Sequence, residues 1–172
     1  MIEMKEMEIL HDGDADLGVL NGKTIAVIGY GAQGRAQALC MRDSGLSVVI
    51  GIRPGKSKDA AEEDGFETLS VTDAAKRADI IHILLPDEMH GPVYDKEIAP
   101  VLTAGKTLSF SHGFSIVFGE IKPPKDVDVI MVAPKSPGTE ERKRFVEGFG
   151  VPGLIAVRQN PSGKAKEVAL AI

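Results

Sequence analysis

The stretch KTIAVIGYGAQG, residues 23–34, decides the fold of this 172-residue chain. Residues Thr24–Ile28 are apolar or β-branched, which indicates a strand buried on both faces. Three glycines follow with the spacing G-x-G-x-x-G, at Gly29, Gly31 and Gly34, and the next eleven residues have a helical pattern. A strand, a glycine turn and a helix in this order predict a dinucleotide site.

Each glycine of this turn has its own expected task. Gly29 permits the tight turn, Gly31 lets the backbone approach a pyrophosphate, and Gly34 lets the helix pack closely on the strand. The helix that follows offers unpaired N–H groups and a partial positive charge to the phosphates. We therefore expect a dinucleotide to lie over this turn.

Composition excludes several classes of partner and of fold. A net charge of −5 disfavours a non-specific nucleic-acid or membrane-surface partner. No apolar run reaches the roughly 18 residues of a membrane span, and the acidic beginning of the chain is unlike a signal peptide. Cys40 is the only cysteine, so no internal disulfide is possible and a reducing, cytoplasmic location is expected. We expect Cys40 to be a small buried apolar residue rather than a nucleophile.

The loop after the second expected strand, residues 47–50, bears on the choice of cofactor. NAD-binding folds usually place a carboxylate there to hold the ribose 2′-hydroxyl, and this strand runs into Gly-Ile-Arg instead. Three cations and a hydroxyl cluster on the following Pro-Gly turn: Arg53, Lys56, Ser57 and Lys58. They suit a 2′-phosphate, the alternative being a solvated basic loop. Asp59 keeps NADH possible, because its carboxylate could turn toward the ribose.

Strands and helices alternate along the rest of the chain. Strands are expected at residues 79–85, 107–110, 127–133 and 153–157, and helices at 58–64, 72–78, 92–98, 139–148 and 164–172. This alternation predicts one α/β domain of Rossmann type, a doubly wound, mostly parallel sheet with helices on both faces. Thr72 is the expected N-cap of its helix. The last helix has no cap, which predicts that residues 1–172 are part of a longer polypeptide.

Polar residues follow three of the expected strands at the edge where α/β sheets bind ligands. Asp87 follows the strand at 79–85, His112 the strand at 107–110, and Lys135 the strand at 127–133. His112 is either a turn residue or a site residue, and Lys135 is either a surface lysine or an anchor for an anionic substrate. His82 lies inside its strand and is expected to be a hydrogen-bonded core histidine.

Five stretches in the same order resemble the N-terminal domain of ketol-acid reductoisomerase. They are DADLGVLNGKTIAVIGYGAQGRAQALCMRDSG, ILLPDE, SFSHGF, PPKDVDVIMVAPKSPG and VEGFGVPGLIAV, within residues 14–172. The resemblance implies an oxidoreductase of valine and isoleucine biosynthesis. Its substrate is 2-acetolactate or 2-aceto-2-hydroxybutyrate, and its reaction is a magnesium-dependent alkyl migration followed by reduction with NADPH.

The resemblance also assigns roles to residues of this sequence. It implies cofactor contacts at the glycine turn, at the basic loop, along PDEMH and after APK: Tyr30, Gly31, Ala32, Gln33, Arg53, Ser57, Asp87, Glu88, Met89, His90 and Gly138. It implies that the active-site residues are His112 and Lys135. The sequence departs from the family in a basic loop that is one residue shorter, with Lys56 at a usual serine, and in Ser136 at a usual glycine. The choice between NADPH and NADH stays open.

The magnesium ligands of the family are Asp and Glu residues of a helical C-terminal domain, beyond residue 172. Hard oxygen ligands are needed for Mg²⁺, and Asp59 and Glu63 lie one helical turn apart but near the expected adenosine end. We therefore expect this chain to bind the cofactor without turnover, and the intact enzyme to be a homo-oligomer. The alternatives are a stand-alone nucleotide-binding regulatory module and another dehydrogenase without its substrate domain.

Overall fold

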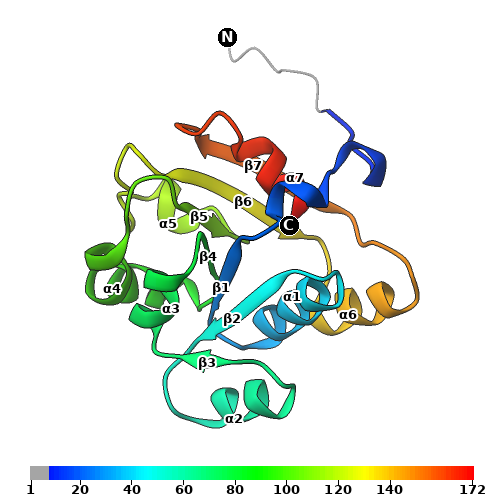
Figure 1. Cartoon of the computed structure of the whole chain (residues 1–172), viewed down its shortest axis with the longest axis horizontal. Coiled ribbons are helices and arrows are strands. Elements are labelled where there is room, and N and C mark those ends of the chain that lie inside the picture. Colours follow the sequence, from blue (N-terminus) through cyan, green and yellow to red (C-terminus); the bar gives the residue numbers. More distant parts are fainter. Residues whose placement is uncertain (1–7) are drawn as a thin grey trace.

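The computed structural model describes residues 8–172, which form a seven-stranded sheet flanked by helices (Figure 1). The strand order is β3-β2-β1-β4-β5-β6-β7. The strands are β1 Thr24–Ile28, β2 Ser47–Gly51, β3 Thr68–Leu69, β4 Ile80–Ile83, β5 Thr107–Phe110, β6 Asp128–Pro134 and β7 Gly153–Gln159. All pairs are parallel except that of β6 with β7. The predicted doubly wound α/β fold is confirmed.

A helix follows each of the strands, including the last one. They are α1 Ala32–Asp43, α2 Lys56–Glu63, α3 Val71–Arg77, α4 Asp87–Val93, α5 Phe114–Val117, α6 Gly138–Val146 and α7 Ala165–Ala171. Shorter helical turns are η1 Asp12–Asp14, η2 Leu17–Leu20, η3 Tyr94–Ile98 and η4 Ala99–Val101. From β1, the strands β2 and β3 are added on one side of the sheet, and β4 to β7 are added on the other side. The direction in which strands are added therefore switches between β1 and β4. Open α/β sheets bind ligands at such a reversal.

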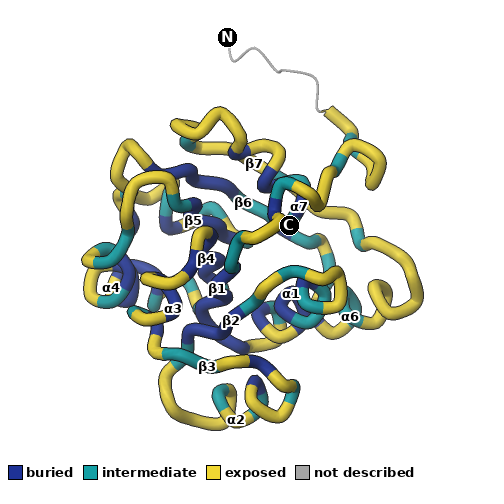
Figure 2. Tube along the Cα trace, viewed as in Figure 1, coloured by how far each residue is buried: buried dark blue, intermediate teal, exposed yellow. Residues whose placement is uncertain are grey.

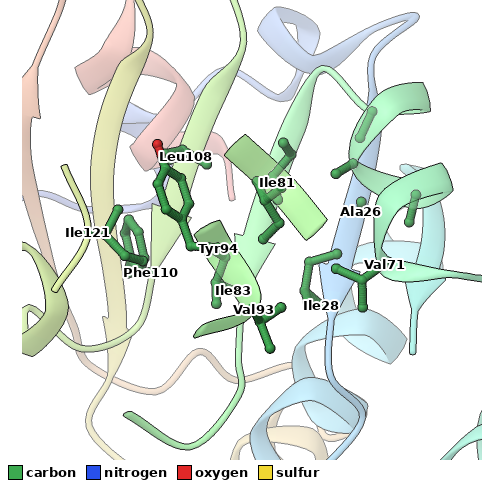
Figure 3. Close-up of a cluster of buried hydrophobic side chains, with 14 of the residues drawn as sticks. Ala26, Ile28, Val71, Ile81, Ile83, Val93, Tyr94, Leu108, Phe110 and Ile121 are labelled. Carbon is green, nitrogen blue, oxygen red and sulfur yellow. The ribbon is translucent and has the colours of Figure 1, made fainter. Parts of the chain in front are cut away.

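The sheet separates two apolar cores. One lies under α3, α4 and η3, and the other under α1 and α7. The central strands are buried on both faces, whereas α2 and most connecting loops are exposed (Figure 2). Figure 3 shows the first core, in which Ile81 and Ile83 of β4 lie beside Tyr94 and Val93. Residues 8–172 include no helix long and apolar enough to cross a bilayer.

The observed elements differ from the expected ones mainly near the ends of the sheet. β7 runs antiparallel to β6, with Gly153 paired opposite Pro134. The reason is that α6 packs on α1 instead of crossing over the sheet, so the chain returns to the sheet at the same end at which β6 left it. The two-residue strand β3 was too short to be predicted. An alternating pattern of strands and helices cannot distinguish a crossover helix from one that returns to the same edge.

Three expected helix starts were wrong, and that of α2 lies at Lys56 rather than Lys58. α4 begins at Asp87 rather than Pro92, because Pro86 occupies its N-cap and two acidic residues stand in the first turn. Pro92 lies inside α4, and the chain continues into the wider turn η3. The N-cap of α3 is Ser70, not Thr72, and its hydroxyl accepts a hydrogen bond from the N–H of Asp73 at 3.1 Å.

Candidate functional site

A cleft of about 730 Å³ lies at the carboxyl ends of β1, β2, β4 and β5. Its walls are the glycine turn after β1, the loop before α2, the start of α4 and the residues after β5. Eleven of the predicted site residues line it: Gly29, Tyr30, Gly31, Ala32, Gln33, Arg53, Ser57, Asp87, Met89, His90 and His112. The fold therefore brings together segments that are far apart in the sequence.

The three glycines of the turn differ in how closely the protein packs around them. Gly29 has φ +98° and a Cβ there would lie 3.0 Å from the Leu84 carbonyl oxygen. A Cβ on Gly34 would lie 2.5 Å from the Gly29 carbonyl oxygen, so this glycine lets α1 approach β1. A Cβ on Gly31 would have no heavy atom of residues 8–172 within 4 Å. The backbone at Gly31 is thus bare toward the cleft.

The N-terminus of α1 faces the same space. Its first intrahelical hydrogen bond runs from the N–H of Arg35 to the carbonyl of Gly31, at 2.9 Å. The N–H groups of Ala32, Gln33 and Gly34 therefore have no intrahelical acceptor, and the first turn contains no acidic side chain. An anion at this end of α1 would meet both free donors and the positive end of the helix dipole.

The side chain of Tyr30 supports the turn from the core side. Its ring packs edge-to-face on Phe66, with centroids 5.8 Å apart, and its hydroxyl donates to Asp64 at 2.8 Å. Asp64 also accepts from Arg35 at 2.7 Å, and this guanidinium holds the pKa of the Asp64 carboxyl below its usual range. Burial and the Asp64 carboxylate raise the pKa of Tyr30. Its hydroxyl is therefore engaged in the protein and stays protonated.

The opposite end of the cleft is basic and exposed. Arg53, Lys56 and Ser57 line it, and the side chain of Arg53 is 57% exposed. Its Nη2 donates to Oε1 of Glu97 at 2.8 Å, and Glu97 is only 18% exposed. Lys58 instead pairs with Glu62 along α2, at 3.3 Å, and Asp59 lies outside the lining. Two cations and a hydroxyl thus face the cleft here without an aspartate.

The third wall carries the histidines. Nδ1 of His112 lies 2.9 Å from Oδ2 of Asp87, and the imidazole, 68% exposed, stacks on Phe114. His90 is buried, with Nε2 2.8 Å from the Leu85 carbonyl oxygen and Nδ1 2.8 Å from the Ser115 hydroxyl. Because a carbonyl only accepts, Nε2 of His90 carries the proton. His90 therefore braces the wall, whereas the ring of His112 is open to solvent.

Four predicted site residues lie outside the lining of the cleft: Gly34, Glu88, Lys135 and Gly138. Glu88 is exposed on α4, and Lys135 is exposed after β6, with its backbone N–H donating to the Pro152 carbonyl at 2.8 Å. A Cβ on Gly138 would lie 2.2 Å from the Ala32 carbonyl oxygen, so this glycine permits the contact of α6 with the start of α1.

Several lining residues were not predicted. Val71, Ile83 and Val93 belong to the core of Figure 3 and also form the apolar floor of the cleft. Ser111 lines the cleft directly before His112. Its place at the end of a buried strand could have pointed to it. The floor could not have been read from sequence, because its residues look like ordinary core.

Two predictions about single residues can be judged directly. His82 is fully buried and hydrogen-bonded on both ring nitrogens, as expected of a core histidine, and burial lowers its pKa to about 4. Cys40 is partly buried on α1, and burial raises the pKa of its thiol. A thiol with a raised pKa is a poor nucleophile.

Within residues 8–172, no three His, Cys, Asp or Glu side chains gather in a way that could hold a metal ion. Asp59 and Glu63 both lie on α2, outside the cleft.

Comparison with known proteins gives the relationship of the chain. Residues 19–172 match the family described as acetohydroxy acid isomeroreductase, NADPH-binding domain. The ketol-acid reductoisomerase (NADP(+)) of Akkermansia muciniphila is 72% identical over 166 residues, 96% of this chain and 51% of the relative. The NADP(+) enzyme of Petrotoga mobilis is 56% identical over 165 residues, 95% of this chain and 50% of the relative.

A solved structure of an NADH-preferring ketol-acid reductoisomerase from an uncultured archaeon has a TM-score of 0.93 and 62% identity, covering 96% of this chain and 52% of that one. An NAD-binding semialdehyde dehydrogenase from Cupriavidus necator, 21% identical with a TM-score of 0.70, shares the fold alone. The chain spans about half the length of the relatives it matches. It belongs to the acetohydroxy acid isomeroreductase, or ketol-acid reductoisomerase, family, of which it carries the NADPH-binding domain.

Proposed function

We propose that this domain binds NADP(H) in the cleft and forms the cofactor half of a ketol-acid reductoisomerase. The observation that carries this is the bare backbone of Gly31 beside the free N–H groups of α1, at the edge of a cleft of about 730 Å³. A pyrophosphate needs donors and close backbone approach, and no side chain of residues 8–172 fills that place. The turn residues Gly29, Tyr30, Gly31, Ala32 and Gln33 hold the pyrophosphate, and Gly34 supports them.

The adenosine end lies toward Arg53, Lys56 and Ser57. A guanidinium, an ammonium and a hydroxyl at one end of the cleft favour a ribose 2′-phosphate, and therefore NADPH over NADH. The relatives carry both names, since one from an uncultured archaeon is a ketol-acid reductoisomerase (NAD(+)). The side chains at this end of the cleft favour NADPH for this chain independently of those names.

The nicotinamide end then lies toward α4 and the residues after β5. Bound NADPH supplies a hydride there. Asp87, Met89 and His90 form the wall, with Glu88 beside them, and Gly138 keeps α6 against the start of α1. Asp87 accepts a hydrogen bond from Nδ1 of His112, which leaves Nε2 free to exchange a proton with the substrate.

The complete reaction needs more than this domain. We propose that the chain is the N-terminal domain and that Mg²⁺, which polarises the ketol oxygens of 2-acetolactate, is held by a helical C-terminal domain. Lys135, at the same sheet edge, attracts the anionic substrate. The chain alone then binds cofactor without turnover. The intact enzyme is a cytoplasmic homo-oligomer, and the net charge of −5 favours a small-molecule substrate over nucleic acid or a membrane surface.

Isothermal titration of this chain with NADPH and NADH tests the proposal. We expect saturable binding of both, tighter for NADPH, with no turnover of 2-acetolactate until the C-terminal half of a relative and Mg²⁺ are added. Absence of binding by either dinucleotide would contradict the cofactor site. Turnover by this chain with Mg²⁺ alone would contradict the proposed source of the metal ligands, and binding without any response to the added half would favour a regulatory module.

A further inference from the structure

A chain of side-chain hydrogen bonds, buried at His82 and partly buried toward the cleft, meets at Gln37 in the second turn of α1. Gln37 is 3% exposed, and its amide contacts three other side chains. Its Nε2 donates to Oε1 of Gln33 at 2.9 Å and to Oγ of Ser111 at 3.1 Å. Its Oε1 lies 2.7 Å from Nε2 of His82. One amide thus connects α1, β4 and the end of β5.

Two backbone carbonyls fix the direction of every hydrogen bond in this chain. Nε2 of Gln33 donates to the Ser136 carbonyl at 2.9 Å, and the Ser111 hydroxyl donates to the Val132 carbonyl at 2.8 Å. Because carbonyls only accept, Oε1 of Gln33 and Oγ of Ser111 are left to accept from Gln37. The Gln37 carbonyl oxygen must then accept from Nε2–H of His82.

These directions also fix the tautomer of His82, with the ring proton on Nε2. Since Nε2 donates to Gln37, Nδ1 accepts from the Ser109 hydroxyl, 2.8 Å away. Burial lowers the pKa of His82 to about 4, so the ring is neutral at neutral pH. The polar groups that contact it, from α1 and β5, are uncharged. The donor and the acceptor of each hydrogen bond in the chain therefore stay the same at neutral pH.

The consequence lies in the segments that these bonds join. Gln33 belongs to the glycine turn, Ser111 precedes His112, and Ser136 follows Lys135. Each segment carries residues assigned above to cofactor or substrate. A network in which the polar groups are paired is rigid, since moving one member leaves others without partners.

We propose that Gln37 is a positioning residue that holds the glycine turn and the Ser111–His112 segment in the geometry the cofactor needs. This inference rests on the cofactor site proposed above. Gln37 does not line that cleft and acts through Gln33 and Ser111, which do. His82 in turn orients Gln37. Because the network contacts the turn and not the basic loop, it supports NADPH and NADH equally.

Three variants separate positioning from mere stability. Gln37→Met keeps the length of the side chain and removes its polar atoms; we expect roughly fivefold or greater loss of affinity for both dinucleotides with their ratio unchanged. The triple variant Gln37→Met, His82→Leu, Ser109→Ala removes the polar partners together, so it should regain stability relative to Gln37→Met and not affinity. Ser162→Ala is the control, because it removes a bond to buried Asp128 at the opposite edge of the sheet, costing stability alone.

The free domain gives a readout that needs no cofactor. In ¹⁵N spectra, His82 should show the Nε2–H tautomer, and Gln37→Met should shift the amide signals of Gln33, Ser111 and Ser136, whereas Ser162→Ala should not. Affinity that follows stability across all three variants, or unshifted amides in Gln37→Met, would overturn the positioning role. If the unmodified domain binds no dinucleotide, the proposed function fails, and the amide shifts still decide whether Gln37 holds these segments.

Discussion

The two ends of the cleft are built in different ways. The glycine turn consists of backbone held by the core, with Gly34 in contact with Gly29 and Tyr30 tied to Asp64. The basic end consists of exposed side chains on a loop, where Arg53 forms an ion pair with Glu97. On the proposed binding mode, dinucleotide binding should depend on the integrity of the fold, whereas the preference for NADPH over NADH should change without disturbing the fold.

The largest effect is expected from Gly34→Ala. The added Cβ would lie 2.5 Å from the Gly29 carbonyl oxygen and 3.1 Å from its carbon, so backbone must move. We expect a loss of about 2–3 kcal/mol in the free energy of unfolding, measured with urea, together with loss of dinucleotide binding. An unchanged unfolding midpoint would show that the turn is not fixed by the core.

Gly31→Ala is the matched substitution in the same turn. Gly31 has φ −80°, and its Cβ would meet no heavy atom of residues 8–172 within 4 Å. We expect stability within about 0.5 kcal/mol of the unmodified domain, and about tenfold weaker binding of NADPH and NADH in calorimetry, because the methyl group occupies space needed by the phosphates. Unchanged affinity would contradict the close approach of backbone to pyrophosphate.

Arg53→Ala tests the other end. Removing the guanidinium should weaken NADPH binding roughly tenfold or more, as loss of a charge-assisted phosphate contact does, and leave NADH within about twofold. Stability should fall little, because the Arg53 side chain is 57% exposed and an ion pair that reaches solvent contributes little. Equal loss for both dinucleotides would mean that Arg53 contacts a part common to them.

Glu97→Gln should act in the opposite direction. Its carboxylate accepts a hydrogen bond from Nη2 of Arg53 and places a negative charge near the expected phosphate. We expect the amide to raise the preference for NADPH over NADH about threefold. Glu62→Gln is the control, because its carboxylate contacts Lys58 of α2 and the Thr68 hydroxyl and not Arg53. A preference that falls in Glu97→Gln would show that Glu97 positions Arg53 rather than competing for it.

A smaller effect is expected away from both ends. Glu141 on α6 is partly buried, its Oε2 has no hydrogen-bond partner among residues 8–172, and burial raises the pKa of its carboxyl to about 7. Between its unfolded pKa near 4.5 and about 7, the folded state binds more protons, so this group makes stability fall as pH rises. Urea titrations at several pH values should show that the free energy of unfolding falls less steeply with rising pH in Glu141→Gln, with cofactor affinity unchanged. Identical pH profiles for the two proteins would contradict the raised pKa.

The local sequence pattern was enough to predict the part of the cleft that is formed by backbone atoms. The strand Thr24–Ile28 and the glycine turn were predicted correctly, because burial on both faces and the spacing of glycines are visible within twelve residues. The direction of β7 was not predictable, since it depends on where α6 packs. Nor was the bond of Arg53 to Glu97, 44 residues away, or that of Gln37 to Ser111, 74 residues away.

Chemical-shift mapping with ¹⁵N-labelled domain tests the division of the cleft most directly. Titration with NADPH should shift the amides of Gly31, Ala32 and Gln33 and those of residues 53–57. NADH should shift the first group alike and the second much less. Shifts confined to other surfaces, or equal shifts at residues 53–57 with both dinucleotides, would contradict a backbone site for the pyrophosphate and a side-chain site for the 2′-phosphate.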